Sequence, residues 1–276
     1  MIQFSKAEGA GNDFVLVPSY PPADPSALSQ ILCDRRRGIG ADGVIWLERL
    51  DGGVGPVFRA HCFNRDGSRM KTCINGFRCA ARVAAHLGWT GCKFHFLVDD
   101  RAVEAEVTDA SIALELEGPH GSPIPLNLPP GSLAKVGHAV WSGDPHLVIE
   151  LERDAWPEAG FAEAARSLRW WKGVSDAGTN VHFVAADRAN WLIRSYERGV
   201  EEETLACGSG CMAAALVISR RNTRPSSLSF LTRGGDQICV QVGQGQRAWR
   251  VSGPARVAFE GSFDARDPAL AQGIGA

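Results

Sequence analysis

Cys73-Ile74-Asn75-Gly76 stands at the head of one largely apolar stretch of the chain, and Cys207-Gly208-Ser209-Gly210 stands at the head of another. Glycine and small polar residues are typical of the turn that opens a helix. The first stretch, residues 75–88, has a narrow apolar stripe and ends at a glycine. The second, residues 212–219, is apolar almost all round, which indicates a helix enclosed on every side. The repetition predicts two copies of one architecture, each with a cysteine just ahead of a buried helix.

Short segments of alternating polarity, the pattern of β-strands, surround both predicted helices. Two further stretches, 26–36 and 158–170, have one apolar face and predict additional helices. The fold class is therefore α+β, with a mostly antiparallel arrangement of strands. The predicted strands are residues 2–6, 14–17, 44–50, 57–63, 94–98, 102–107, 112–116, 136–141, 147–151, 181–185, 191–196, 237–242 and 248–251.

Proline and glycine mark one joint in the chain. Residues 118–131 hold five prolines and three glycines in fourteen positions, a composition that opposes both helices and central strands. We interpret this stretch as an interdomain linker. The predicted domains are residues 1–117 and 132–261, and the tail 262–276 is expected to pack back on the first domain.

The composition excludes several classes of function. The 29 basic and 31 acidic residues nearly cancel, which argues against a nucleic-acid-binding surface. No apolar run approaches the roughly 18 residues of a membrane span, and the first six residues do not resemble a secretion signal. The eight cysteines are therefore expected to be free thiols in a reducing cytoplasm.

The two cysteines that open helices suggest a specific chemistry. The positive end of a helix favours a thiolate, so the pKa of each cysteine is expected to fall, and the exposed N–H groups there can bind an anion. Two such ends facing each other would hold one carboxylate between two acid/base thiols. One thiolate could then remove a proton from the adjacent carbon while the opposite thiol delivers one to the other face. The N–H donors would absorb the charge that develops on the carboxylate.

Other interpretations of these cysteines stay open at this point. A lone cysteine before a helix is often a small buried apolar residue. A cysteine hydrolase would need a histidine partner, and His61, His146 or His182 could supply one, but the second cysteine segment would then have no role. A zinc site would need ligands such as His61, Cys62, Cys73 and Cys79, whose spacing is not that of a usual zinc motif.

A series of short motifs occurs in the order found in diaminopimelate epimerases, and the chain resembles that family from Phe4 to about Gly261. Any one of these motifs alone would be weak evidence, whereas the collinear set is specific. The motifs are Gly11-Asn12-Asp13-Phe14, residues 34–43 (DRRRGIGADG), residues 63–68 (FNRDGS), residues 73–79 (CINGFRC), Gly143-Asp144-Pro145-His146, residues 180–184 (NVHFV), Tyr196-Glu197-Arg198-Gly199, residues 204–210 (TLACGSG) and residues 251–255 (VSGPA).

The resemblance implies two pseudo-symmetric domains, each a barrel-like sheet around a central buried helix, with the active site in the cleft between them. It implies a homodimer and a small-molecule amino-acid substrate, with no cofactor and no metal. The implied reaction is the interconversion of LL- and meso-diaminopimelate in the synthesis of lysine and peptidoglycan precursors.

The resemblance also assigns roles to individual residues. Cys73 and Cys207 are implied to be the acid/base pair. The implied substrate-binding residues fall into two groups: Ile74, Asn75, Gly208 and Ser209 around the carboxylate, and Asn12, Asn64, Asp144, Asn180, Glu197 and Arg198 around the ammonium groups and the distal carboxylate. An arginine fork suits a carboxylate, and a glutamate offers a counter-charge for an ammonium.

Three departures from the family pattern bear on the substrate. Ile74 stands where the family has glycine, Asp144 stands where it has asparagine, and the stretch 200–204 is one residue longer than usual. A carboxylate only accepts hydrogen bonds and would repel a distal carboxylate. A related racemase without pyridoxal phosphate, acting on another amino acid, and a different isomerase of the same fold are therefore the alternatives.

Overall fold

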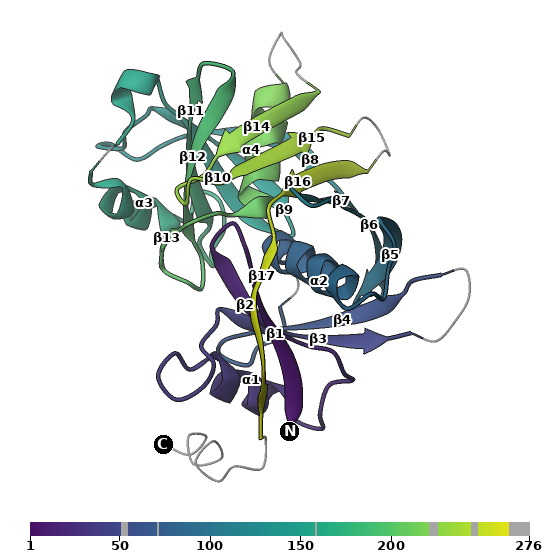
Figure 1. Ribbon diagram of the computed structural model, residues 1–276. Coiled ribbons are helices and arrows are strands. Elements are labelled where there is room, and N and C mark those ends of the chain that lie inside the picture. Colours follow the sequence, from purple (N-terminus) through teal and green to yellow (C-terminus); the bar gives the residue numbers. More distant parts are fainter. Residues whose placement is uncertain (51–54, 71, 158, 221–225, 244–247, 265–276) are drawn as a thin grey trace. The chain divides into compact units, whose positions relative to one another are not determined.

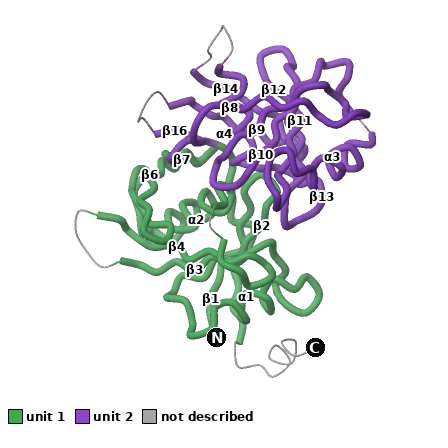
Figure 2. The backbone as a smooth tube through the Cα atoms, turned by 180° about the vertical axis from the view of Figure 1, so that it is seen from behind, with its two compact units in different colours: residues 1–115, 253–276 green, residues 116–252 purple. Residues whose placement is uncertain are grey.

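The computed structural model of the protein describes residues 1–50, 55–70, 72–157, 159–220, 226–243 and 248–264 (Figure 1). The chain divides into two compact units (Figure 2). Unit 1 comprises Met1–Glu115 together with the chain from Gly253 onward, and unit 2 comprises Leu116–Ser252. Both units mix strands with helices, so the α+β prediction is confirmed.

Unit 1 is built on one sheet with the strand order β17-β1-β2-β3-β4-β5-β6-β7. Neighbouring strands are antiparallel except in the pairs β2–β3 and β4–β5, which are parallel. Helix α1 lies between β2 and β3 in sequence, and α2 between β4 and β5. The bounds are β1 Ile2–Gly9, β2 Asn12–Val17, α1 Pro25–Cys33, β3 Gly43–Arg49, β4 Phe58–Asn64, α2 Ile74–His86, β5 Lys93–Val98, β6 Arg101–Val107, β7 Ile112–Leu116 and β17 Arg256–Phe263.

Unit 2 has the strand order β8-β9-β10-β11-β12-β14-β15-β16, with a short strand β13 antiparallel to the end of β12. The pairs β10–β11 and β12–β14 are parallel and the others are antiparallel. The bounds are β8 His120–Asn127, β9 Val136–Ser142, β10 Asp144–Glu150, the 3₁₀ turn η1 Arg153–Ala155, α3 Phe161–Arg169, β11 Asn180–Asp187, β12 Asn190–Glu197, β13 Glu202–Thr204, α4 Gly208–Ser219, β14 Ser227–Leu231, β15 Gln237–Gln241 and β16 Trp249–Gly253.

Within the described residues the two units repeat one topology. Reading each sheet from its first strand, the parallel pairs join the third to the fourth strand and the fifth to the sixth. A helix follows the third strand (α1 or α3) and another follows the fifth (α2 or α4). This matches the physical requirement that parallel neighbours be joined by a crossover, here a helix. The expected repetition of one architecture is therefore present in the strand order.

The central helices are the most buried elements of their units. Helix α2 contacts β1, β2 and β17, and α4 contacts β9, β10 and β15. Every residue of α4 from Gly210 to Ile218 is buried, as the all-round apolar pattern predicted. No helix in the described part of the chain has the length and hydropathy needed to cross a membrane.

The structure corrects the prediction that residues 118–131 form an interdomain linker. Residues 120–127 form β8, which pairs antiparallel with β9 and shifts its register between His120 and Ile124. Proline is tolerated there because β8 is an exposed strand, and β9 is its partner on one side only. The end of the second domain also differs from the prediction. Most of β17 falls within the predicted second domain, residues 132–261, but β17 pairs with β1 in unit 1. The yellow and purple strands of Figure 1 therefore run side by side.

The expected packing of the tail is described only in part. Phe263 packs with Phe4 and Val17 in the core of unit 1. Residues 265–276 lie outside the described residues. Two further strands, β13 and β14, were also missed, and α3 begins three residues later than predicted.

Candidate functional site

The two cysteines hold the same position in the two units. Cys73 is the N-cap of α2, and its Sγ accepts the N–H of Gly76 at 3.4 Å. Cys207 is the N-cap of α4, and its Sγ accepts the N–H of Gly210 at 3.4 Å. Both have extended backbone angles, so a sulfur takes the place that a serine or threonine oxygen usually fills. The structure thus places each cysteine at the positive end of a central helix.

Close packing explains the glycine at the third position of each helix. A Cβ on Gly210 would lie 2.3 Å from Cε1 of His182, and a Cβ on Gly76 would lie 3.1 Å from Ile45 and 3.2 Å from Phe14. The first turn of each helix therefore rests directly on side chains of the sheet. A side chain at either glycine would push the turn, and with it the capping sulfur, away from its place.

The first turns contain the residues predicted to surround a carboxylate. Ile74 and Asn75 are buried in α2, where Asn75 Oδ1 accepts a hydrogen bond of 2.8 Å from Arg78. Gly208 and Ser209 open α4, and Ser209 Oγ lies 3.5 Å from Cys207 Sγ. The first N–H groups of a helix have no partner within that helix, so both turns can bind an anion. Because Asn75 directs its side chain at Arg78, its backbone is the part suited to that role.

The surroundings of Cys73 are polar. Its Sγ lies 3.5 Å from Oδ1 of Asn12, and Nδ2 of Asn12 donates to Oδ2 of Asp42 at 2.7 Å. Asn64 lies at the end of β4 and donates to Ser68 Oγ at 2.9 Å. Asn12 and Cys73 are therefore in contact. Asp42 was not predicted as a site residue but is a direct partner of Asn12, and only its place in the motif of residues 34–43 could have drawn attention to it.

The surroundings of Cys207 correct one expectation. Burial raises the pKa of the Cys207 thiol well above its ordinary value, and the nearby Glu197 carboxylate raises it further. The hydroxyl of Ser209 and the N–H of Gly210 act in the opposite direction but do not outweigh burial. The predicted fall in pKa is therefore wrong for Cys207 because loss of water around the thiol outweighs the helix dipole. Glu197 itself accepts a hydrogen bond from Thr204.

A second polar group in unit 2 gathers three of the predicted binding residues. Arg198 forms an ion pair with Asp144, and the backbone N–H of Arg198 donates to Asn180 Oδ1 at 2.8 Å. Asn180 Nδ2 donates to the carbonyl of Pro145 at 3.3 Å. These contacts join the starts of β10 and β11 to the end of β12. Arg198 was predicted to bind the distal carboxylate of a substrate, but in this structure its guanidinium pairs with the carboxylate of Asp144.

The three histidines considered as partners for a cysteine have other partners. His182 is fully buried, with Nδ1 2.8 Å from Ser195 Oγ and Nε2 2.8 Å from Nδ1 of His146. His61 pairs with Glu48 at 2.9 Å. Burial lowers the pKa of His146 to about 4 and that of His182 well below its ordinary value, so both rings are neutral at pH 7. This pair, which is stacked beneath the first turn of α4, was not predicted from sequence as a unit.

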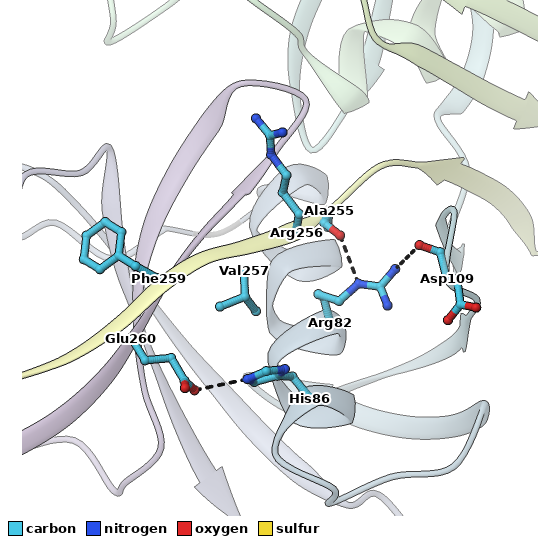
Figure 3. Close-up of a pocket in the computed structure, with 8 residues that line it drawn as sticks. All are labelled: Arg82, His86, Asp109, Ala255, Arg256, Val257, Phe259 and Glu260. Carbon is cyan, nitrogen blue, oxygen red and sulfur yellow. Dashed lines mark hydrogen bonds and ion pairs between the residues drawn. The ribbon is translucent and has the colours of Figure 1, made fainter.

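No group of three or more His, Cys, Asp and Glu side chains in the described ranges is arranged to hold a metal ion. A pocket in unit 1 lies at the opposite end of α2 from Cys73 (Figure 3). Its side chains are engaged in holding β17 to α2: Arg82 donates to the carbonyl of Ala255 at 2.9 Å, and His86 lies 3.2 Å from Glu260. These contacts indicate a structural role for the pocket residues.

Comparison with known proteins gives concordant matches. The family model described as diaminopimelate epimerase matches residues 4–118. The diaminopimelate epimerase of Aquifex aeolicus is 30% identical, over 94% of this chain and 97% of its own. That of Chlorobaculum tepidum is 35% identical, over 92% of this chain and 98% of its own. Among solved structures, a phenazine biosynthesis protein of the PhzF family from Enterococcus faecalis has the same fold, with a TM-score of 0.72, 14% identity, and coverage of 94% of this chain and 98% of that one.

Proposed function

Because the chain belongs to the diaminopimelate epimerase family, we propose that it is an isomerase that interconverts LL- and meso-diaminopimelate without a cofactor. The observation that carries the proposal is the duplicated N-cap: Cys73 and Cys207 close the first turns of two equivalent helices with the same 3.4 Å hydrogen bond. Packing alone gives no reason for a sulfur at both places, whereas a reaction that uses both faces of one carbon needs two equivalent acid/base groups.

In the proposed reaction one thiolate removes the α-proton and the other thiol protonates the opposite face. The N–H groups of the first turns, with Asn75, Gly208 and Ser209, would bind the α-carboxylate and accept the charge that moves onto it. The raised pKa of Cys207 means that this residue carries its proton in the free enzyme. Cys207 is therefore ready to act as the acid, and acts as the base in the reverse direction only after losing that proton.

The remaining predicted residues supply recognition of the distal end. Arg198 would bind the distal carboxylate and Glu197 an ammonium group, with Asn12, Asn64 and Asn180 completing the polar surface. Inversion further requires that the half-site of unit 1, around Cys73, and that of unit 2, around Cys207, act on the same α-carbon. The repeated topology gives each unit a thiol at the head of an equivalent helix, as a reaction with two acid/base groups needs.

The assembly and location follow the same proposal. The eight cysteines all lie in the described part of the chain, where none of them forms a disulfide, and this suits a cytoplasmic enzyme of amino-acid synthesis. A homodimer is supported by the exposed Phe259 on β17, a strand at the edge of its sheet with β1 as its partner. An exposed aromatic side chain on an edge strand is a surface that association would bury.

The ion pair between Arg198 and Asp144 favours a second candidate. If Asp144 serves as a counter-ion for a substrate cation, the enzyme is a racemase of an amino acid with a cationic distal end and no distal carboxylate. Both side chains are partly exposed, so a substrate group can reach either of them.

One experiment separates the two candidates. The enzyme is incubated in deuterated water with LL-diaminopimelate, meso-diaminopimelate, L-lysine, L-ornithine or L-glutamate, and exchange of the α-hydrogen is followed by NMR. The leading proposal requires exchange and inversion with the two diaminopimelates and none with the others. Exchange with lysine or ornithine alone would establish the second candidate, and exchange with none of the five would overturn both.

A further inference from the structure

We infer that Asp42 is a positioning residue: it fixes the side-chain amide of Asn12 so that a hydrogen-bond acceptor faces the Cys73 thiol. This inference rests on the proposed function only in treating Cys73 as an acid/base group. Asp42 Oδ2 accepts from Nδ2 of Asn12 at 2.7 Å, and Oδ1 of the same amide lies 3.5 Å from the sulfur of Cys73.

The orientation of the amide follows from the chemistry of its two ends. An asparagine side chain has a donating NH₂ end and an accepting oxygen, and a carboxylate can only accept. The NH₂ end of Asn12 must therefore face Asp42, which leaves the oxygen to face Cys73. In that orientation the amide can accept the S–H hydrogen but cannot donate to a thiolate. Asn12 thus favours the protonated form of Cys73 in the free enzyme, so Cys73, like Cys207, acts as a base only after losing that proton.

Asp42 is itself held from several sides. Its Oδ1 accepts from Arg35 at 2.9 Å, and its Oδ2 also accepts the N–H of Asp13 at 3.2 Å. The backbone N–H of Asp42 returns a bond of 2.9 Å to the carbonyl of Asp13. Arg35 further makes a two-point contact with Asp13, at 2.7 and 3.1 Å. The carboxylate is therefore fixed by charged and backbone donors rather than free to rotate.

Asp13 strengthens this arrangement. Burial raises the pKa of Asp13, but hydrogen bonds from Arg35 and Lys6 outweigh it and bring the pKa to about 2. Lys6, itself buried, lies 2.7 Å from Asp13 and also donates to the carbonyl of Gly40. Asp13 thus remains ionised across the range in which an enzyme works, and keeps Arg35 in place beside Asp42.

The described residues of unit 2 hold no equivalent of this arrangement. The pairing of Phe14 with Gly43 and of His146 with Asn180 puts Thr179 in the place of Asp42, and Asp144 in that of Asn12. Thr179 is buried and its hydroxyl donates to the carbonyl of Asn180. Of the two half-sites, as far as their residues are described, the one around Cys73 has an orienting carboxylate, Asp42, and the one around Cys207 has none.

Other titratable groups near Cys73 do not supply the same effect. Cys62 on β4 and Cys79 on α2 interact with it electrostatically, but burial raises the pKa of both thiols far above neutral. Both are therefore uncharged at working pH. Asp42 is linked to the sulfur through Asn12, whose amide contacts both groups.

The test measures alkylation of Cys73 in the free enzyme, so its result does not depend on the substrate. The rate of Cys73 modification by iodoacetamide is followed from pH 6 to pH 10 by mass spectrometry of the Cys73 peptide. In Asp42→Ala the amide can turn its NH₂ end to the sulfur. The apparent pKa of Cys73 should then fall by about one unit, a tenfold rise in reactivity below that pKa. Asp42→Asn, which keeps one accepting oxygen, should give an intermediate profile.

Asp34→Ala is the matched control. Asp34 is an exposed carboxylate in the same loop, where it accepts the N–H groups of Arg36 and Arg37 at 2.7 and 2.8 Å. Its loss should leave the Cys73 profile unchanged. A wild-type profile in Asp42→Ala, or an equal shift in Asp34→Ala, would overturn the inference. If Asp42→Ala does not fold, Asn12→Ala decides: loss of the acceptor should also lower the apparent pKa of Cys73, and an unchanged profile would refute the role of the amide.

Discussion

The first turns of α2 and α4 have the same backbone arrangement but rest on different chemistry. Beneath α2 the sheet presents Phe14 and Ile45, and beneath α4 it presents His146 and His182 at the same register positions. Each turn is capped by a cysteine and has a glycine three residues later. The side chains beneath the first turn of the central helix are therefore apolar in unit 1 and titratable in unit 2.

The same contrast extends to the polar residues at the ends of the strands. Asn12 and Asp144 both begin the third strand of their sheets, each after a glycine with positive φ. Asn12 is held by a carboxylate, whereas Asp144 is a carboxylate held by Arg198. The comparison teaches that the topology fixes where each thiol stands, while neighbouring side chains decide its protonation and what it can recognise.

The largest expected effect tests whether epimerisation needs both N-cap cysteines. Cys73→Ala and Cys207→Ala should each lower the rate of epimerisation by at least about 10²–10⁴-fold, the scale of general acid–base catalysis. Cys92→Ala, which removes an exposed thiol, serves as the control and should keep wild-type turnover. Near-normal turnover in either active-site variant would refute the two-thiol assignment. Exchange at one face without inversion would support it.

The next prediction concerns the side chains beneath the two central helices, which are apolar in unit 1 and titratable in unit 2. His146 and His182 are neutral in the folded chain, because burial lowers their pKa values below the unfolded value of about 6.5. As the pH falls from about 6.5 towards 4, the unfolded state binds protons that the folded state does not. The free energy of unfolding should therefore fall over this window, by on the order of 3 kcal/mol for His146 alone.

Replacing the pair with the residues of unit 1, His146→Phe with His182→Ile, should flatten this pH dependence. The measurement is urea unfolding at pH 7, 6 and 5. His120→Gln, a change at an exposed histidine of the same unit, should keep the wild-type slope. A grafted variant that still loses stability as steeply as the wild type between pH 6.5 and 5 would show that the buried pair is not the cause.

A smaller effect should follow from adding one methyl group beneath each helix. Gly210→Ala places a Cβ 2.3 Å from the His182 ring and should lower the free energy of unfolding by about 1–3 kcal/mol. Gly76→Ala meets Ile45 at 3.1 Å and should cost less. Gly91→Ala, where no atom lies within 4 Å, is the control. Thermal unfolding should rank the three in that order, and a larger loss for Gly76→Ala would reverse the packing argument.

Most of this fold could be predicted from sequence because its signals are local. Alternation identified most strands, and the all-round apolar pattern of residues 212–219 identified α4 as enclosed. The misses share a physical cause. Strand β8 contains prolines that an edge strand tolerates. Strand β17 belongs to unit 1 through pairing with β1, a contact across about 250 residues that no local pattern reveals.

The candidate site shows the same difference between local features and contacts between residues distant in sequence. Both N-cap cysteines could be predicted because capping is a local property. The raised pKa of Cys207 could not, because it depends on burial by residues distant in sequence. The link from Asp42 to Asn12 spans 30 residues and the stacking of His146 on His182 spans 36. Sequence alone therefore gave Asp42 no role and presented the two histidines as separate candidates.

The smallest expected effect concerns Asp144. With diaminopimelate as the substrate, Asp144 competes with the distal carboxylate for Arg198, and the two carboxylates repel each other. Because both partners are partly exposed, the ion pair is worth at most about 1 kcal/mol. Asp144→Asn should therefore lower the KM for LL-diaminopimelate by up to about fivefold with little change in kcat. Asp154→Asn, a change on the 3₁₀ turn η1, is the matched control. If the substrate instead carries a distal cation, Asp144 is its counter-ion and the same change should raise KM by more than tenfold, the scale of a charged hydrogen bond. Steady-state kinetics of this variant thus tests whether the carboxylate of unit 2 opposes the substrate or binds it.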